Sequence, residues 1–107
     1  MNAFSMRADT RCQRGLHFVY HLPVMPDHAL LESTLRDAFA DRLVGSDEQW
    51  GKRVVRRLVL QFRFEVRLGA RDHEISFLFR TTAPVAAREA DQASFEQALT
   101  ACVGQLP

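Results

Sequence analysis

The clearest pattern of hydrophobic and polar positions lies between Val54 and Arg80. Even positions from 54 to 68 are apolar except Arg56, while most odd positions are polar. The parity then reverses, and the odd positions from 75 to 79 are apolar. An alternation with a period of two is typical of a strand with one buried face. The pattern therefore predicts one long antiparallel β-hairpin with a core face and a solvent face.

A short loop closes this predicted hairpin and sets its register. Residues 69–72 have the length and composition of a hairpin loop. If they pair Leu68 with His73, every inward side chain meets an inward partner, and a slip of one residue would turn the phenylalanines outward. The inward pairs are then Val66 with Ile75, Phe64 with Phe77 and Phe62 with Phe79, and the outward pairs are Arg67 with Glu74, Gln61 with Arg80 and Arg63 with Leu78.

Two segments before the hairpin have strand character. Residues 16–24 are rich in aromatic and apolar side chains, and Pro23 and Pro26 end this run because proline cannot donate to a ladder. The first fourteen residues leave two alternatives open. Residues 3–8 are either a short edge strand or part of a flexible arm.

A helix is predicted from Asp27 to Val44. Asp27 complements the positive end of a helix, and apolar residues recur after it at helical spacing. Gly45 has the position of a residue that ends a helix. The connector 46–51 follows, which places Trp50 on a loop.

A second helix follows the hairpin, and its start is open between Pro84 and Asp91. A stripe at helical spacing marks its body, and Gly104 ends it. The stripe consists of Phe95, Ala98, Leu99 and Cys102. The order (β)βαββα predicts an α+β fold, a two-layer sandwich with two helices on one face of a mostly antiparallel sheet. We expect residues 1–107 to form a single domain.

Charge and composition narrow the function only slightly. The chain has 14 basic and 13 acidic side chains, so its net charge does not point to nucleic acid, anionic lipid or an acidic substrate. Lys52 is the single lysine among these basic residues. Such an excess of arginine is typical of a GC-rich genome, and we expect a bacterial-type protein.

The cysteines and the N-terminal segment favour a cytoplasmic protein. Cys12 and Cys102 are too few for a disulfide-stapled scaffold, so we expect both to be reduced. The first fifteen residues show no apolar core of a signal peptide. No run approaches the ~20 apolar residues of a membrane span, and we expect no membrane partner.

No motif predicts a catalytic, cofactor or metal site. His17 and His21 share one face of a predicted strand but lie about 13 Å apart at ~3.3 Å per residue, too far to share a metal. Cys12 stands among arginines, which favour a reactive thiolate, but no histidine or acid stands at a helpful spacing. Cys102 is interpreted as a small core residue. We therefore expect no enzyme, and chemistry built on Cys12 or the histidines is the third alternative.

The outer face of the predicted hairpin carries two features with functional meaning. The first is a basic stripe that can follow a phosphate backbone: Arg53, Arg57, Arg63 and Arg67, with Arg80 beside it. The second is a set of apolar residues that predicts an interface: Trp50, Val55, Val59 and Leu78.

We expect a small interaction or regulatory module that associates with itself or a protein partner through the sheet or hairpin. Nucleic-acid binding through the basic stripe is the alternative. No aromatic residue interleaves the stripe, as single-strand binders require, and Glu65 and Glu74 dilute its charge.

Overall fold

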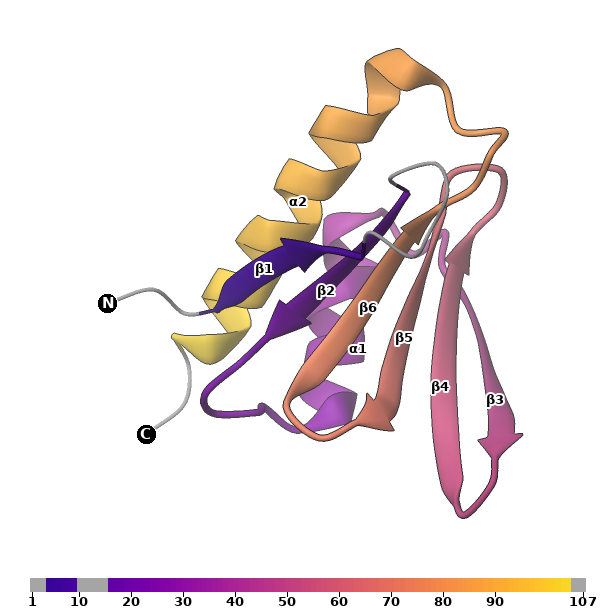
Figure 1. Cartoon of the computed structure of the whole chain (residues 1–107). Helices are drawn as coiled ribbons and strands as arrows, with labels where there is room; N and C mark the ends of the chain where they lie inside the picture. The colour runs from indigo at the N-terminus through magenta and orange to yellow at the C-terminus, as the bar shows by residue number, and fades with distance from the viewer. Residues whose placement is uncertain (1–3, 10–15, 105–107) are drawn as a thin grey trace.

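The described part of the chain folds into one antiparallel sheet with two helices, in the order ββαββββα (Figure 1). This computed structural model describes residues 4–9 and 16–104. The predicted α+β class is confirmed, and the sheet has more strands than predicted. The elements are β1 (Ser5–Ala8), β2 (His17–His21), α1 (His28–Ala38), β3 (Val44–Trp50), β4 (Arg53–Leu60), β5 (Phe64–Arg71), β6 (Glu74–Phe79) and α2 (Val85–Val103).

The strands lie in the order β1-β2-β6-β5-β4-β3, and every neighbouring pair is antiparallel. The two edges are therefore β1 and β3. Both helices lie behind the sheet in Figure 1, and the tip of the β3–β4 hairpin extends beyond them. We call the sheet face that the helices cover the helix face, and the opposite one the open face.

The core lies between the helices and the helix face of the sheet. Phe77 is fully buried there, and its ring contacts the rings of Phe64, Phe79 and Phe95 with centroids 4.8–4.9 Å apart. These rings join β5, β6 and α2, and burying one such side chain contributes about 1.5–3 kcal/mol. The predicted stripe of α2 is buried, and burial raises the pKa of the Cys102 thiol.

The predicted long strand from Val54 to Leu68 is wrong, because a turn divides it. β4 ends at Leu60, residues 61–63 form the turn, and β5 begins at Phe64. Phe62 lies in this turn with φ 67° and is 61% exposed, whereas the sequence pattern predicted it in the core. The last residue of β4, Leu60, pairs with the first residue of β5, Phe64, across the turn.

The predicted register between β5 and β6 is also wrong, by two residues. Leu68 pairs with Ile75 rather than His73, and Phe64 pairs with Phe79. Pairing shifts between Leu68 and Arg71, where Gly69 adopts φ 90°, a conformation that glycine accepts without strain. Since the error is two residues, each side chain stays on its predicted face. The outward pairs change, so that Arg67 faces Ser76 and Glu65 faces Leu78.

The helix predicted to reach Val44 ends at Ala38. Asp27 caps its start by accepting a hydrogen bond of 2.8 Å from the backbone N–H of Ala29. Ala40 and Asp41 then adopt positive φ values of 53° and 58°, which a helix cannot contain.

The segment after α1 is the edge strand β3 rather than a helix end and a loop. Trp50 is therefore the last residue of a strand, and Gly45 lies inside it. A Cβ atom at Gly45 would overlap the guanidinium group of Arg56, so a larger residue there would displace the end of this side chain.

Two further alternatives are settled by the described residues. Ser5–Ala8 pair with β2 as a short edge strand, while residues 10–14 lie outside the described part of the chain. The last helix begins after Pro84. Asp91 is inside it and buried, where it accepts two hydrogen bonds of 2.8 Å from Arg63 in the β4–β5 turn.

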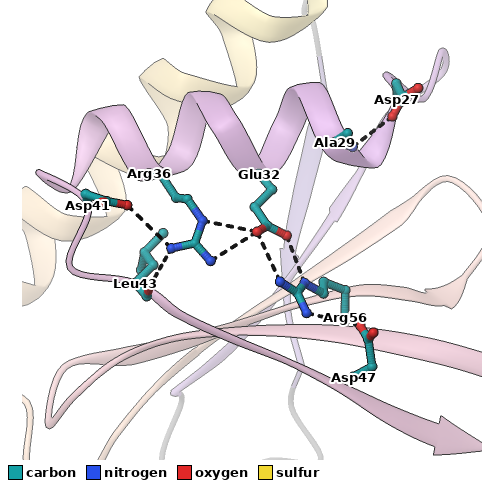
Figure 2. Close-up of polar contacts among 8 residues, drawn as sticks. All are labelled: Asp27, Ala29, Glu32, Arg36, Asp41, Leu43, Asp47 and Arg56. Atoms are coloured by element: carbon teal, nitrogen blue, oxygen red, sulfur yellow. Dashed lines mark hydrogen bonds and ion pairs between the residues drawn. The ribbon is translucent and has the colours of Figure 1, made fainter.

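A polar network joins α1 to the β3 edge (Figure 2). Glu32 of α1 accepts hydrogen bonds from Arg36 and from Arg56 of β4, the latter at 2.8 and 3.2 Å. Arg56 also donates to Asp47 of β3 at 3.3 Å, and Arg36 donates to the backbone oxygen of Leu43 at 2.6 Å. Arg56 thus interrupts the apolar alternation of β4 because it binds a carboxylate of the helix layer.

Among the described residues, no helix combines the length and the apolar character that crossing a bilayer requires.

Glu32→Gln should lower the free energy of unfolding by about 1–2 kcal/mol at pH 7, because charge-assisted hydrogen bonds to two arginines are weakened. Hydrogen bonding from Arg56 outweighs burial and holds the pKa of Glu32 below its ordinary value of 4.5. This stabilisation is therefore present above pH 4.5 and lost as the pH falls through the lowered pKa. Urea unfolding at pH 7 and pH 3 should show the difference between wild type and variant shrink with acid.

The matched control is Glu89→Gln, since Glu89 is exposed on α2 and has no ion pair with another described residue. Its effect should stay within about 0.5 kcal/mol at both pH values. An equal effect of the two substitutions would contradict the assigned role of Glu32.

Candidate functional site

The open face of the sheet contains a hollow with a volume of about 180 Å³. Side chains from both halves of the sheet line it, because Trp50 reaches inward from the β3 edge and β1 forms the opposite side. Its charged and aromatic lining residues are Arg7, Asp9, His17, Trp50, Arg67, Arg71 and Glu74. Val19, Ala70 and Ser76 complete the lining.

A buried carboxylate organises the arginines of this face. Glu65 of β5 is 3% exposed and accepts hydrogen bonds from Arg57 of β4 and from the Nε of Arg67, the latter at 2.6 Å. Burial by itself would raise the pKa of Glu65, but the hydrogen bonds and charges of the two arginines lower it below 4.5. Glu65 is therefore ionised at neutral pH and fixes both guanidinium groups.

Trp50 covers one side of Arg67. The guanidinium carbon of Arg67 lies 5.2 Å from the centroid of the Trp50 ring, within the range of a cation–π contact. The contact bridges across β4, the strand between them, and Val55 on the open face of β4 is fully buried. The chain thus covers part of its own open face with long side chains.

Asp9 and His17 form a second polar pair in the wall of the hollow. The Nδ1 atom of His17 lies 3.1 Å from an Asp9 carboxylate oxygen. The Nε2 atom is buried and has no hydrogen-bond partner within residues 4–9 and 16–104. Burial lowers the pKa of His17, the charges of Arg67 and Arg7 lower it further, and Asp9 opposes them. His17 is therefore neutral at pH 7 and presents an acceptor nitrogen.

The structure does not bring the five arginines of the predicted stripe together. Arg57 and Arg67 share Glu65, but Arg63 turns to Asp91 of α2. Arg53 pairs with Asp72 at 3.0 Å near the β5–β6 turn, and Arg80 is exposed beyond β6. Carboxylates of the same chain thus engage four of the five predicted stripe residues.

The predicted interface residues have different surroundings. Trp50 is 38% exposed, while Val59 and Leu78 are half-buried on the open face. Val55 is fully buried, so it offers no surface to a partner. Val44, which the sequence pattern did not single out, is 67% exposed on β3.

The remaining candidate side chains do not converge. His21 and His73 lie with ring centroids 6.1 Å apart, and His73 Nδ1 lies 3.0 Å from the backbone oxygen of Leu22. In the described ranges, no three histidine, cysteine or acidic side chains are placed to hold a metal ion. Cys12 lies outside the described residues.

Sequence reasoning placed Glu65 on the outer face but missed that it binds two arginines there, and it did not single out Asp9. Glu65 and Arg67 have the same parity in the alternating pattern, which was a signal for an ion pair on one face. Asp9 and His17 are brought together only by the pairing of β1 with β2. Comparison with protein-family models, curated proteins and solved structures finds no match for the chain.

Glu65→Gln should lower the free energy of unfolding by about 1–3 kcal/mol, because it removes the charge that satisfies two arginines in a buried position. Chemical denaturation at pH 7 measures the effect. The matched control is Glu48→Gln, which removes the more exposed partner of Arg57 at 3.2 Å and should cost less than about 1 kcal/mol. If both substitutions lower the free energy of unfolding equally, burial of Glu65 does not strengthen its contribution to stability.

His17 should titrate below its ordinary pKa of 6.5 in the folded chain. The unfolded chain takes up the proton more readily, so His17 contributes a loss of stability as the pH falls below 6.5. Asp9→Asn should lower the pKa of His17 further, because the carboxylate is the group that raises it. Nitrogen chemical shifts of the imidazole measure both values, and a pKa at or above 6.5 in the wild type would contradict the assignment.

Proposed function

We propose that this protein is a self-association module whose β3 edge pairs with the β3 edge of a second copy. One observation carries the proposal: within residues 4–9 and 16–104, β3 has a neighbour on one side only, and six of its seven residues are exposed. Such an edge presents a row of backbone N–H and C=O groups that a further strand can pair.

β3 lacks several of the devices that usually protect an edge. It contains no proline or lysine, and its pairing with β4 continues without a bulge from Val44 to Trp50. The other edge strand, β1, has only four residues. The longer edge therefore offers more backbone pairs to an added strand.

A two-fold antiparallel pairing centred on Asp47 uses the whole of β3. It sets Val44 of one copy opposite Trp50 of the other at both ends of the interface, since 44 and 50 lie equally far from 47. Both side chains belong to the open face. Pairs of an aromatic and a β-branched residue across strands contribute roughly 0.2–1 kcal/mol each.

The acidic residues of β3 oppose this pairing less than their charges alone would. Asp47 would face its own copy, but Arg56 of the same chain holds it at 3.3 Å. Glu48 is held by Arg57 at 3.2 Å. Because each carboxylate has a cationic partner within its own chain, the repulsion between the two edges is reduced.

Light scattering over a range of protein concentrations tests the association. The wild type should approach twice the chain mass of 12.2 kDa. Val44→Lys should raise the dissociation constant at least tenfold, because it places a charge where the pairing needs an apolar contact. Val24→Lys is the control, since Val24 is 59% exposed outside β3. A wild type that remains monomeric at about 1 mM would refute the proposal.

Cysteine cross-linking tests the register. In a chain with Cys12→Ser and Cys102→Ala, Asp47→Cys should form a disulfide-linked dimer on mild oxidation, because directly opposed residues of antiparallel strands have Cα atoms about 4.5–5.5 Å apart. Ser5→Cys on the exposed edge strand β1 is the control and should cross-link far more slowly. Faster cross-linking through residue 5 would show that the copies meet at the β1 edge and would contradict the proposed β3 pairing.

A further inference from the structure

The hollow of the open face contains guanidinium groups with unused hydrogen-bond donors. The Nε of Arg67 donates a hydrogen bond to Glu65, and its two Nη groups donate to no other described residue. Arg71 makes no side-chain hydrogen bond or ion pair within the part of the chain that the structure describes. Arg7 is paired with Glu74 at 3.4 Å. Two of the three arginines therefore retain donors that face a cavity.

We propose that this hollow binds a small organic carboxylate, which Arg67 and Arg71 hold by its oxygens and Trp50 contacts through its apolar body. The inference goes beyond the proposed association and does not depend on it. A guanidinium group presents parallel N–H donors that match the two oxygens of a carboxylate.

An anion would bind to the cations of the wall that carboxylates do not fully engage. Three arginines line the hollow together with the carboxylates of Asp9 and Glu74, and Arg67 is also bound to Glu65. Glu74 contacts Arg7, and Asp9 contacts the neutral His17. Among the described residues, Arg71 is therefore the lining arginine without a carboxylate partner, and Arg67 keeps Nη groups that donate to no other described residue.

Arg67 is held in place before any ligand arrives. The buried carboxylate of Glu65 fixes its Nε, and the Trp50 ring covers one side of the guanidinium group. The entropy cost of ordering this long side chain on binding is therefore smaller. Arg71 is exposed at the end of β5 and supplies the second cation.

The size and lining of the hollow limit the ligand. The volume of about 180 Å³ is similar to that of an apolar cavity of about 150 Å³ that holds benzene. Trp50 and Val19 add apolar surface, and Ser76 adds a hydroxyl group. A single carboxylate on a small ring suits this combination, and benzoate is the simplest probe of that class.

Trp50 provides the assay, since it is the single tryptophan of the chain. Benzoate should change its fluorescence saturably at pH 7, and benzamide, which has the same ring without the charge, should bind at least tenfold more weakly. The proposal is overturned if benzamide binds as tightly as benzoate. It is also overturned if benzoate gives no saturable fluorescence response and leaves the backbone amide shifts around the hollow unchanged. Equal affinity for inorganic phosphate would overturn the assignment to carboxylates.

Arginine variants assign the response to the hollow. Arg71→Ala should weaken benzoate binding by roughly tenfold or more, the size of a lost charge-assisted hydrogen bond. Arg80→Ala removes an exposed arginine that does not line the hollow and should change the affinity by less than about twofold. If the two variants weaken benzoate binding equally, the binding reflects general charge attraction, and the proposed site is wrong.

One variant separates this proposal from the proposed association. Val44 does not line the hollow, so the Val44→Lys chain should bind benzoate with the wild-type affinity even where its self-association is lost. If the variant does not bind benzoate, the claim that the site is independent of self-association is wrong. If the wild type is monomeric and binds benzoate, only the proposed self-association is refuted.

Discussion

The packing of Phe77 against rings from β5, β6 and α2 holds the two layers of the fold together. It concentrates the large apolar side chains on the helix face of the sheet. The alternation of strand residues then sends the other half of each strand to the open face, where no helix covers them. The chemistry of the open face is thus a consequence of how the core is formed.

The open face is stabilised by a different means. Arg67 of β5 contacts the ring of Trp50 of β3 across β4, and Val55 on this face of β4 is fully buried. The charges of the arginines on this face require partners in a partly dry setting, and Glu65 serves two of them at once. Arginine suits this role because its stem covers apolar surface while its planar head holds several hydrogen bonds. The abundance of arginine therefore has a structural use in this chain, whatever its origin in base composition.

The fold class followed from sequence because the buried strands and α2 alternate or repeat with a clear period. β3 was missed for a physical reason: an edge strand exposed on both faces has no buried side and so leaves no alternation to detect. The buried loop residue Leu43 extended the helical spacing beyond the true end of α1. The hollow was beyond sequence reasoning, since Asp9, His17 and Trp50 meet only through strand pairing.

The turn at residues 61–63 hid a strand boundary for a geometric reason. Leu60 pairs with Phe64 across three residues, so paired positions in β4 and β5 have the same parity and the alternation passes through the turn unbroken. A codon gained or lost in this turn would end that match of parity. The turn itself would then have to absorb the change in length through its conformation, because the buried face of β5 fixes its register with β4. Replacement of the exposed Phe62 leaves the number of residues in the turn unchanged.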